Sequence, residues 1–346
     1  MTSRAGSTAE AARGSDYAVL CRQIKAAGLL DRRPVYYTLK ITANTLLLIA
    51  GITAFALLGR SWYQLLVAAF MAFVFTQIAF VGHDAGHRQI TGSRRADDLL
   101  GVLHGNMLVG LSYGWWVAKH NRHHANPNHE GRDPDVGGGS VLALTDGHAA
   151  ARRGAFGRVL ARIQAYLFFP MLLLEGVHLH VASVKALLGG PSRRSRTTEA
   201  LLLGGHLVGY VTVLFVVLSP LQAVAFILVH QCLFGLYMGC AFAPNHKGMP
   251  ILNDETQLDF LRRQVLTSRN IRGGRFTDFI LGGLNYQIEH HLFPSMPRPA
   301  LRHSQPLVRA HCELHGLPYL ESSLLGSYTQ VLRHLHTVAE PLRAAE

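Results

Sequence analysis

Three short clusters stand out among the 20 histidines of this 346-residue chain. They are groups of histidine at helical spacing: His83 with His87, His120 with His123 and His124, and His290 with His291. Residues three or four positions apart share one face of a helix, with side chains about 5–6 Å apart. Neutral imidazoles grouped in this way can share an iron, zinc or copper ion. Three such clusters in one chain predict a shared metal site.

Long uncharged runs determine where these clusters can lie. Ile41 to Gly59 and Ser61 to Gly82 are each long enough to cross about 30 Å of hydrocarbon as a helix. Ala200 to Asn245 contains no charged residue, and Ser219-Pro220 divides it near its middle. The fold class predicted is therefore an all-α integral membrane protein with four transmembrane helices in two hairpins.

Two further apolar stretches are less suited to crossing a membrane. Leu99 to Ala118 is uncharged but carries glycines, His104, Asn106 and a Trp115-Trp116 pair. Aromatic and polar residues of this kind favour the membrane–water interface. Ile163 to Leu174 is short and contains a proline, which predicts an interfacial or re-entrant helix.

The charge distribution predicts the orientation. The chain has 33 Lys and Arg against 21 Asp and Glu, a formal net charge of +12, while 49% of it is hydrophobic and 16% charged. All these basic residues except Arg60 fall in the two terminal segments and the long middle segment. By the positive-inside rule we expect both termini and the histidine clusters in the cytoplasm of a cell-membrane protein. The net charge thus indicates topology, and a nucleic-acid partner is not expected.

A single domain over 1–346 is predicted, with five parts. These are a cytoplasmic N-terminal segment (1–40), a transmembrane hairpin (41–82), a cytoplasmic and interfacial segment with two histidine clusters (83–198), a second hairpin (199–243) and a cytoplasmic helical cap with the third cluster (244–346).

The clusters resemble the three histidine boxes of the membrane-bound fatty acid desaturases. The matching segments are His-Asp-Ala-Gly-His at 83–87, His-Asn-Arg-His-His at 120–124 and Gln-Ile-Glu-His-His at 287–291. Asn106, Trp115-Trp116 and Asn245-His246 extend the likeness. Gln287 at the start of the third box is similar to the front-end or linoleoyl-CoA type. The His-Pro-Gly-Gly motif of a fused haem domain does not occur, so we expect a separate electron donor such as a ferredoxin/reductase system.

The resemblance implies an O2-dependent desaturase that inserts a cis double bond into a fatty acyl chain, presented as acyl-CoA or lipid. It implies two iron ions held by eight histidines: His83, His87, His120, His123, His124, His246, His290 and His291. Gln287 stands at a ninth position, where its amide oxygen would be a weak ligand. Asp84, Asp135 and Glu289, together with Asp133, are expected to accept hydrogen bonds from ligating imidazoles.

Other functions were weighed against this one. The main alternative is a membrane di-iron hydroxylase or ketolase, because oxygen transfer and desaturation share the same core. Gly110 to Gly114 matches Gly-x-Ser-x-Gly, but that motif needs a preceding strand, which is not predicted here. A metal transporter would place its histidines near the middle of the membrane. Five arginines between Arg262 and Arg275 fit either a phosphate group or the positive-inside bias.

His178 and His180 are expected to be interfacial or to support metal ligands rather than to bind metal themselves, and His206 and His230 are expected to form hydrogen bonds between helices.

Overall fold

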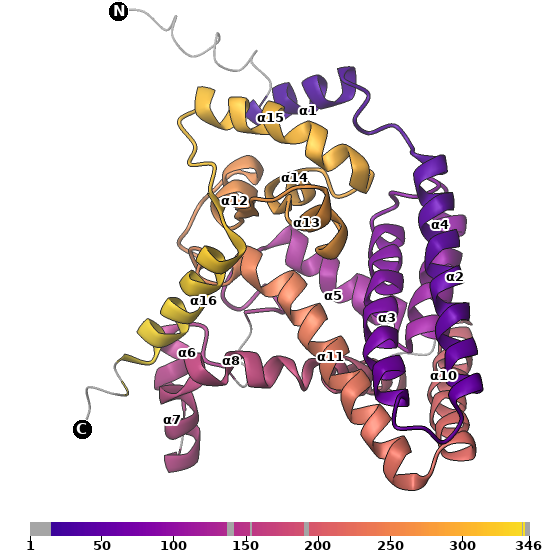
Figure 1. Cartoon of the computed structure of the whole chain (residues 1–346). Coiled ribbons are helices and arrows are strands. Elements are labelled where there is room, and N and C mark those ends of the chain that lie inside the picture. Colours follow the sequence, from indigo (N-terminus) through magenta and orange to yellow (C-terminus); the bar gives the residue numbers. More distant parts are fainter. Residues whose placement is uncertain (1–14, 137–141, 153, 190–193, 341, 343–346) are drawn as a thin grey trace, which may run out of the picture.

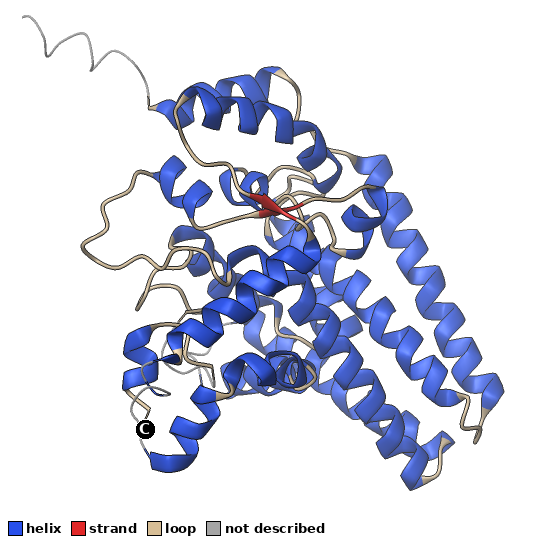
Figure 2. Cartoon of the chain, turned by 60° about the vertical axis from the view of Figure 1, so that its left-hand side comes forward, coloured by secondary structure: helices blue, strands red, loops and turns tan. Residues whose placement is uncertain are grey.

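Four long apolar helices dominate the fold. The computed structural model describes residues 15–136, 142–152, 154–189, 194–340 and 342, and nearly all of its secondary structure is helical (Figures 1 and 2). The long helices are α2 (Pro34–Leu58), α3 (Gln64–Gly86), α10 (Arg194–Val217) and α11 (Pro220–His246). Each is long and apolar enough to cross a membrane. The predicted multi-pass helical fold is confirmed.

Short polar segments close the two hairpins. Gln64 donates from its side chain to the carbonyl groups of Phe55 and Gly59, at 2.7 and 2.9 Å, which ties α3 to the end of α2. Ser219 and Gln222 form a capping box at the start of α11. Gln222 also donates to the carbonyl of Arg60, so the two hairpin tips meet at the end of the bundle shown at the bottom of Figure 1.

The middle of the bundle is the pair α3 and α11. Phe75, Ile78, Phe234 and Met238 of these two helices share one buried apolar cluster. α2 and α10 leave many apolar side chains exposed, as suits helices that face lipid.

Both inner helices run past the predicted limits of the hairpins. α3 continues to Gly86 and α11 to His246, beyond the predicted ends at 82 and 243. A transmembrane span is predicted from an uncharged apolar run, so its predicted limit falls at the first cluster of charged or polar residues, which lipid excludes. Here Asp84 and His246 are buried against protein, so the helices carry their polar ends directly into the site.

The segment between the hairpins is a chain of shorter helices: α4 (Arg94–Val102), the π-helix η1 (Leu103–Val109), α5 (Tyr113–Ala125), α6 (Asp146–Ala150), α7 (Gly154–Arg162), α8 (Gln164–Leu172) and α9 (Glu175–Gly189). The stretch predicted as interfacial, 99–118, is broken between η1 and α5. α8 and α9 meet at an angle of 71°, so the pair is either a bent fifth crossing or a re-entrant element.

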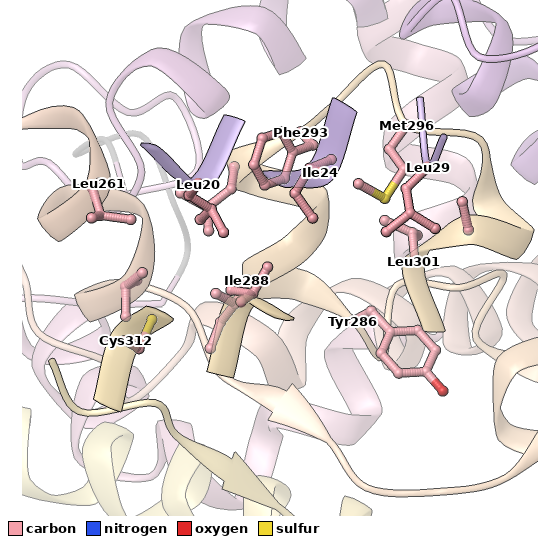
Figure 3. Close-up of a cluster of buried hydrophobic side chains, with 14 residues drawn as sticks. Leu20, Ile24, Leu29, Leu261, Tyr286, Ile288, Phe293, Met296, Leu301 and Cys312 are labelled. Atoms are coloured by element: carbon pink, nitrogen blue, oxygen red, sulfur yellow. The ribbon is translucent and has the colours of Figure 1, made fainter. Parts of the chain in front are cut away.

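The C-terminal helices and α1 (Asp16–Ala26) form the cap. These helices are α12 (Phe260–Leu266), α13 (Arg275–Ile280), α14 (Gln287–Leu292), α15 (Arg298–Leu314) and α16 (Leu324–Val338). Leu20, Ile24, Leu261, Ile288 and Phe293 pack in its apolar core (Figure 3). Two short parallel strands, β1 (Asn270–Ile271) and β2 (Glu321–Ser322), are the exception to the all-α prediction.

Candidate metal centre

Four helices bring the eight predicted histidines together at one end of the bundle. His83 lies on the last turn of α3 and His87 is its C-terminal cap residue. α5 carries three histidines, α11 ends at His246, and α14 carries His290 and His291. This end lies opposite the hairpin tips (Figure 1).

Four of the histidines form the first group. The ligand atoms of His83, His87, His120 and His290 all lie within 4.8 Å of one another. The Nε2 atoms of His83, His87 and His290 are buried and have no hydrogen-bond partner among the described residues. Buried nitrogens left without a partner cost free energy unless something binds them. Their convergence fits a metal ion.

Three histidines form a second group beside the first. His123, His246 and His291 also bring their ligand atoms within 4.8 Å. The side-chain amide of Gln287 lies 2.8 Å from Nε2 of His246, and Asn245 holds its other atom at 3.2 Å. Since the two ends of an amide are assigned from such contacts, either end can face the group. Gln287 therefore lies next to the three histidines of the second group, as a fourth side chain around it.

His124 connects the two groups. Its Nε2 lies 3.0 Å from Nε2 of His120 in the first group. Its ring stacks on that of His291 in the second group, with 4.2 Å between ring centroids. The structure thus brings all eight predicted histidines into one connected cluster, which contains two groups that could each hold a metal ion.

Burial favours the neutral form of five of these histidines. It lowers the pKa of His87, His120, His124, His290 and His291 well below the ordinary value, and neighbouring imidazoles lower it further. Neutral imidazole is the form that binds metal, so these five side chains need to release no proton at neutral pH.

Hydrogen bonds to the other ring nitrogen orient the second group. His123 donates from Nδ1 to Asp133 at 2.9 Å, while Asp135 is farther at 3.6 Å and pairs with Lys119 at 2.5 Å. The Nδ1 atom of His246 bonds the carbonyl of Thr267. Such bonds fix the ring orientation of metal ligands and leave Nε2 free.

Asp84 supports the first group in a similar way. Its Oδ1 lies 3.3 Å from Nδ1 of His83, and its Oδ2 pairs with Arg298 at 2.6 Å. Tyr37 of α2 donates to the same Oδ2 at 3.1 Å. Asp84 therefore links the first box to α2 and to the cap.

Glu289 contacts other groups. Tyr319 and Asn270 donate to its two oxygens, at 2.5 and 2.7 Å, and Asn270 also accepts from the backbone of Ile288. Burial raises the pKa of Glu289 to about 7, although these two hydrogen bonds oppose the shift. Its contacts hold α14 against β1 and the chain before β2.

The remaining singled-out histidines lie away from the cluster. His178 is exposed and bonds Glu175, and His180 bonds backbone carbonyl groups of Gly176 and Val109. His206 donates to the carbonyl of Met107. His230 accepts from Tyr210, a bond between α10 and α11.

The five arginines do not gather at one place. Arg262 pairs with Asp16 and Asp259, and Arg263 donates to backbone carbonyl groups. Arg269 is buried and donates to the carbonyl of Pro244. Arg272 and Arg275 are exposed.

Several residues that contact this site were not predicted from the sequence, among them Tyr37 and Thr267 and the three that follow. Arg298 pairs with Asp84, Gln264 accepts from Nδ1 of His291 at 2.9 Å, and Asn128 donates to the carbonyl of His246 at 3.0 Å. Each lies far in sequence from the group that it contacts. No spacing or composition signal marks such a residue.

Known proteins are similar to most of this chain. The family model described as "Fatty acid desaturase" matches residues 60–323. An acyl-lipid (9-3)-desaturase of Physcomitrium patens is 32% identical over 320 residues, which cover 90% of this chain and 60% of the relative. A Delta(6)-fatty-acid desaturase of Caenorhabditis elegans is 30% identical, over 92% of this chain and 73% of the relative.

A Delta(8)-fatty-acid desaturase of Helianthus annuus is 29% identical, over 94% of this chain and 73% of the relative. The family match spans α3, the second hairpin and all three histidine boxes, and the structure gathers those boxes into one cluster able to bind metal. The chain belongs to the membrane fatty acid desaturase family and is an oxidoreductase.

Proposed function

We propose that this protein is a front-end-type desaturase that uses O2 and two iron ions to insert a cis double bond into a fatty acyl chain. The observation that supports this most strongly is the double cluster of eight histidines, of which seven are buried and His120 is half-buried. Gln287 at the first position of the third box and the names of the relatives support the front-end type.

The proposed ligands fall into the two groups described above. The first ion would be held by His83, His87, His120 and His290, and the second by His123, His246 and His291. His124 lies between the two positions, and Gln287 supplies a weak neighbour to the second. A histidine-only set of this size suits iron or another borderline metal.

The chemistry requires an oxidant beyond the protein's own side chains. An unactivated methylene has no acidic proton, so bound iron with O2 would supply the power to break its C–H bonds. Desaturation removes two hydrogen atoms, that is two protons and two electrons, from adjacent carbons. Reducing O2 to two waters takes four electrons, so two more must come from a separate donor, such as a ferredoxin/reductase system.

Residues around the cluster hold the proposed histidine ligands in place. Asp133, Thr267 and Gln264 bond the outer nitrogens of the second group, and Asp84 does so in the first. These bonds keep each ring oriented. Burial of the cluster excludes bulk water, which limits side reactions of a reactive centre.

We also propose that the centre and both termini face the cytoplasm of a cell membrane. Arg60 is the one basic residue at the hairpin tips, whereas the two terminal segments and the middle segment carry the rest. This distribution favours an inward-facing site that a soluble electron donor can reach.

Expression in a host, followed by fatty acid profiling with double-bond localisation, tests the proposal. We expect a new cis-unsaturated fatty acid with the wild type and none with His123→Ala. His178→Ala is the matched control, because that histidine is exposed and outside the cluster. A hydroxylated or keto product would replace the proposal with the sister activity, and an unchanged profile from iron-loaded protein would reject it.

A further inference from the structure

A buried carboxylate that the metal centre does not use lies at the start of α10. Glu199 is 7% exposed, and its Oε2 accepts three hydrogen bonds. The donors are the hydroxyl of Ser112 at 2.9 Å, the backbone N–H of Gly114 at 3.0 Å and the amide of Asn106 at 3.3 Å. All three donors belong to η1, to α5 or to the short segment between them.

That segment, Gly110 to Gly114, forms an elbow that leads into α5. Gly110 has a φ of +80°, a conformation that favours glycine. The first N–H groups of a helix lack partners within the helix. Here Ser112 N–H bonds Ser183 at 3.0 Å, and Tyr113 N–H bonds Asn106 at 3.1 Å. The N-terminus of α5 is thus held by side chains of three other elements.

Gly114 allows the carboxylate to come this close. A Cβ placed on Gly114 would lie 2.5 Å from Oε1 of Glu199, well inside contact distance. A negative charge at the N-terminus of a helix is favoured by the helix dipole. The contact therefore combines hydrogen bonds, charge and a close approach that only glycine permits.

Hydrogen bonds hold α5 at both ends. The fully buried residues of this 13-residue helix are Tyr113, His123 and His124, and two of these belong to the metal centre. Its C-terminal end is tied to α12, where Gln264 donates to the carbonyl of His124 at 2.9 Å, whereas the contacts of Glu199 hold its start. His120 lies about 12 Å along the helix from Ser112, at 1.5 Å per residue, so a tilt or shift at the elbow moves the histidines.

We propose that Glu199 is a positioning residue for the second histidine box. Its carboxylate joins the start of α5 to α10 by hydrogen bonds. These bonds determine where His120, His123 and His124 lie relative to the other histidines. The inference rests on the proposed metal-binding function and adds to it a residue outside the three boxes.

Metal titration of the purified, metal-free protein in detergent tests the inference. Co2+ is the probe, because its visible spectrum reports coordination geometry without any need for activity. For Glu199→Gln we expect Co2+ affinity at least about tenfold weaker and an altered spectrum, as for other residues that orient ligands. Glu175→Gln is the matched control, because this carboxylate also belongs to a helix of the same bundle but bonds the exposed His178.

A second variant separates positioning from folding. Gly114→Ala leaves Glu199 in place but pushes its carboxylate away, while alanine itself favours a helix. We expect the same loss of affinity and the same spectral change, with a thermal midpoint of the metal-free protein close to wild type. Wild-type affinity and spectrum in Gly114→Ala would overturn the inference, even if Glu199→Gln fails to fold.

The wild-type titration separates this inference from the proposed function. If wild-type protein binds no Co2+ in the histidine cluster, the proposed metal centre fails and this inference fails with it. If wild type binds two equivalents and both variants match it, the role of Glu199 alone is refuted.

Discussion

The buried pair of Asp84 and Arg298 offers a quantitative test of how the cap is joined to the first histidine box. The guanidinium lies 2.6 Å from the carboxylate, and the two side chains are only 2% and 6% exposed. Arg298 also donates to the carbonyl of Phe80 at 2.8 Å. Asp84 in turn contacts His83, so one pair connects α15, α3 and a proposed metal ligand.

Breaking this pair from either side should be costly. Arg298→Met leaves a buried carboxylate without its cation, and Asp84→Asn leaves a buried guanidinium without its anion. Each change is expected to lower the free energy of unfolding by about 3–5 kcal/mol. The double variant removes both charges, so it should lie much closer to wild type than the sum of the single effects, with a coupling of about 2 kcal/mol or more.

Chemical or thermal unfolding of the metal-free protein in detergent, for all four forms, measures this coupling. Arg88→Met is the matched control. Arg88 and Asp98 are also 2.6 Å apart, but the side chains are 29% and 43% exposed, so a loss of about 1 kcal/mol or less is expected. Single effects that simply add in the double variant, or an Arg298→Met loss no larger than that of the control, would refute the reasoning.

Three further outcomes follow from the structure. Gly235→Ala should destabilise the protein by about 1–3 kcal/mol, because its Cβ would lie 2.4 Å from a backbone nitrogen of α9, whereas Gly209→Ala, with nothing within 4 Å, should not; equal unfolding midpoints would contradict this. Asp133→Asn should weaken metal binding about 10–100-fold by releasing the histidine that it orients, while Asp254→Asn at an exposed site should leave a Co2+ titration unchanged. The metal-free protein should lose stability as pH falls from about 7 to 5. Below the ordinary histidine pKa of 6.5, the unfolded chain binds more protons than the folded cluster, in which burial lowers the histidine pKa. The raised pKa of Glu289 acts in the opposite sense, but Glu289 is a single group. A flat or reversed dependence of the thermal midpoint on pH would contradict the last expectation.

The membrane architecture was predictable because lipid imposes a simple rule on sequence. Uncharged runs located all four long helices, and Pro220 marked the start of the last one. The helices α3 and α11 continue past the uncharged runs, to Gly86 and His246, because a polar residue that leaves the lipid need not end its helix. At Asp84 and His246 the surroundings are protein, which no local pattern reveals.

The candidate site was predictable in its members but not in its arrangement. Helical spacing within each box identified the histidines, since neighbours on one helix are local in sequence. The grouping of His290 with His83, and of His291 with His246, depends on how α14 sits against α3 and α11. Arg298 and Glu199 are single residues with distant partners, so only the folded chain shows their contacts.

Metal analysis of the purified protein, produced with iron in the medium, tests the central claim most directly. The account predicts about two irons per chain in the wild type, and a clear loss of bound iron in His123→Ala but not in the exposed His178→Ala. Protein that binds zinc alone, or a His123→Ala variant that keeps both irons, would contradict a two-iron centre built from these histidines.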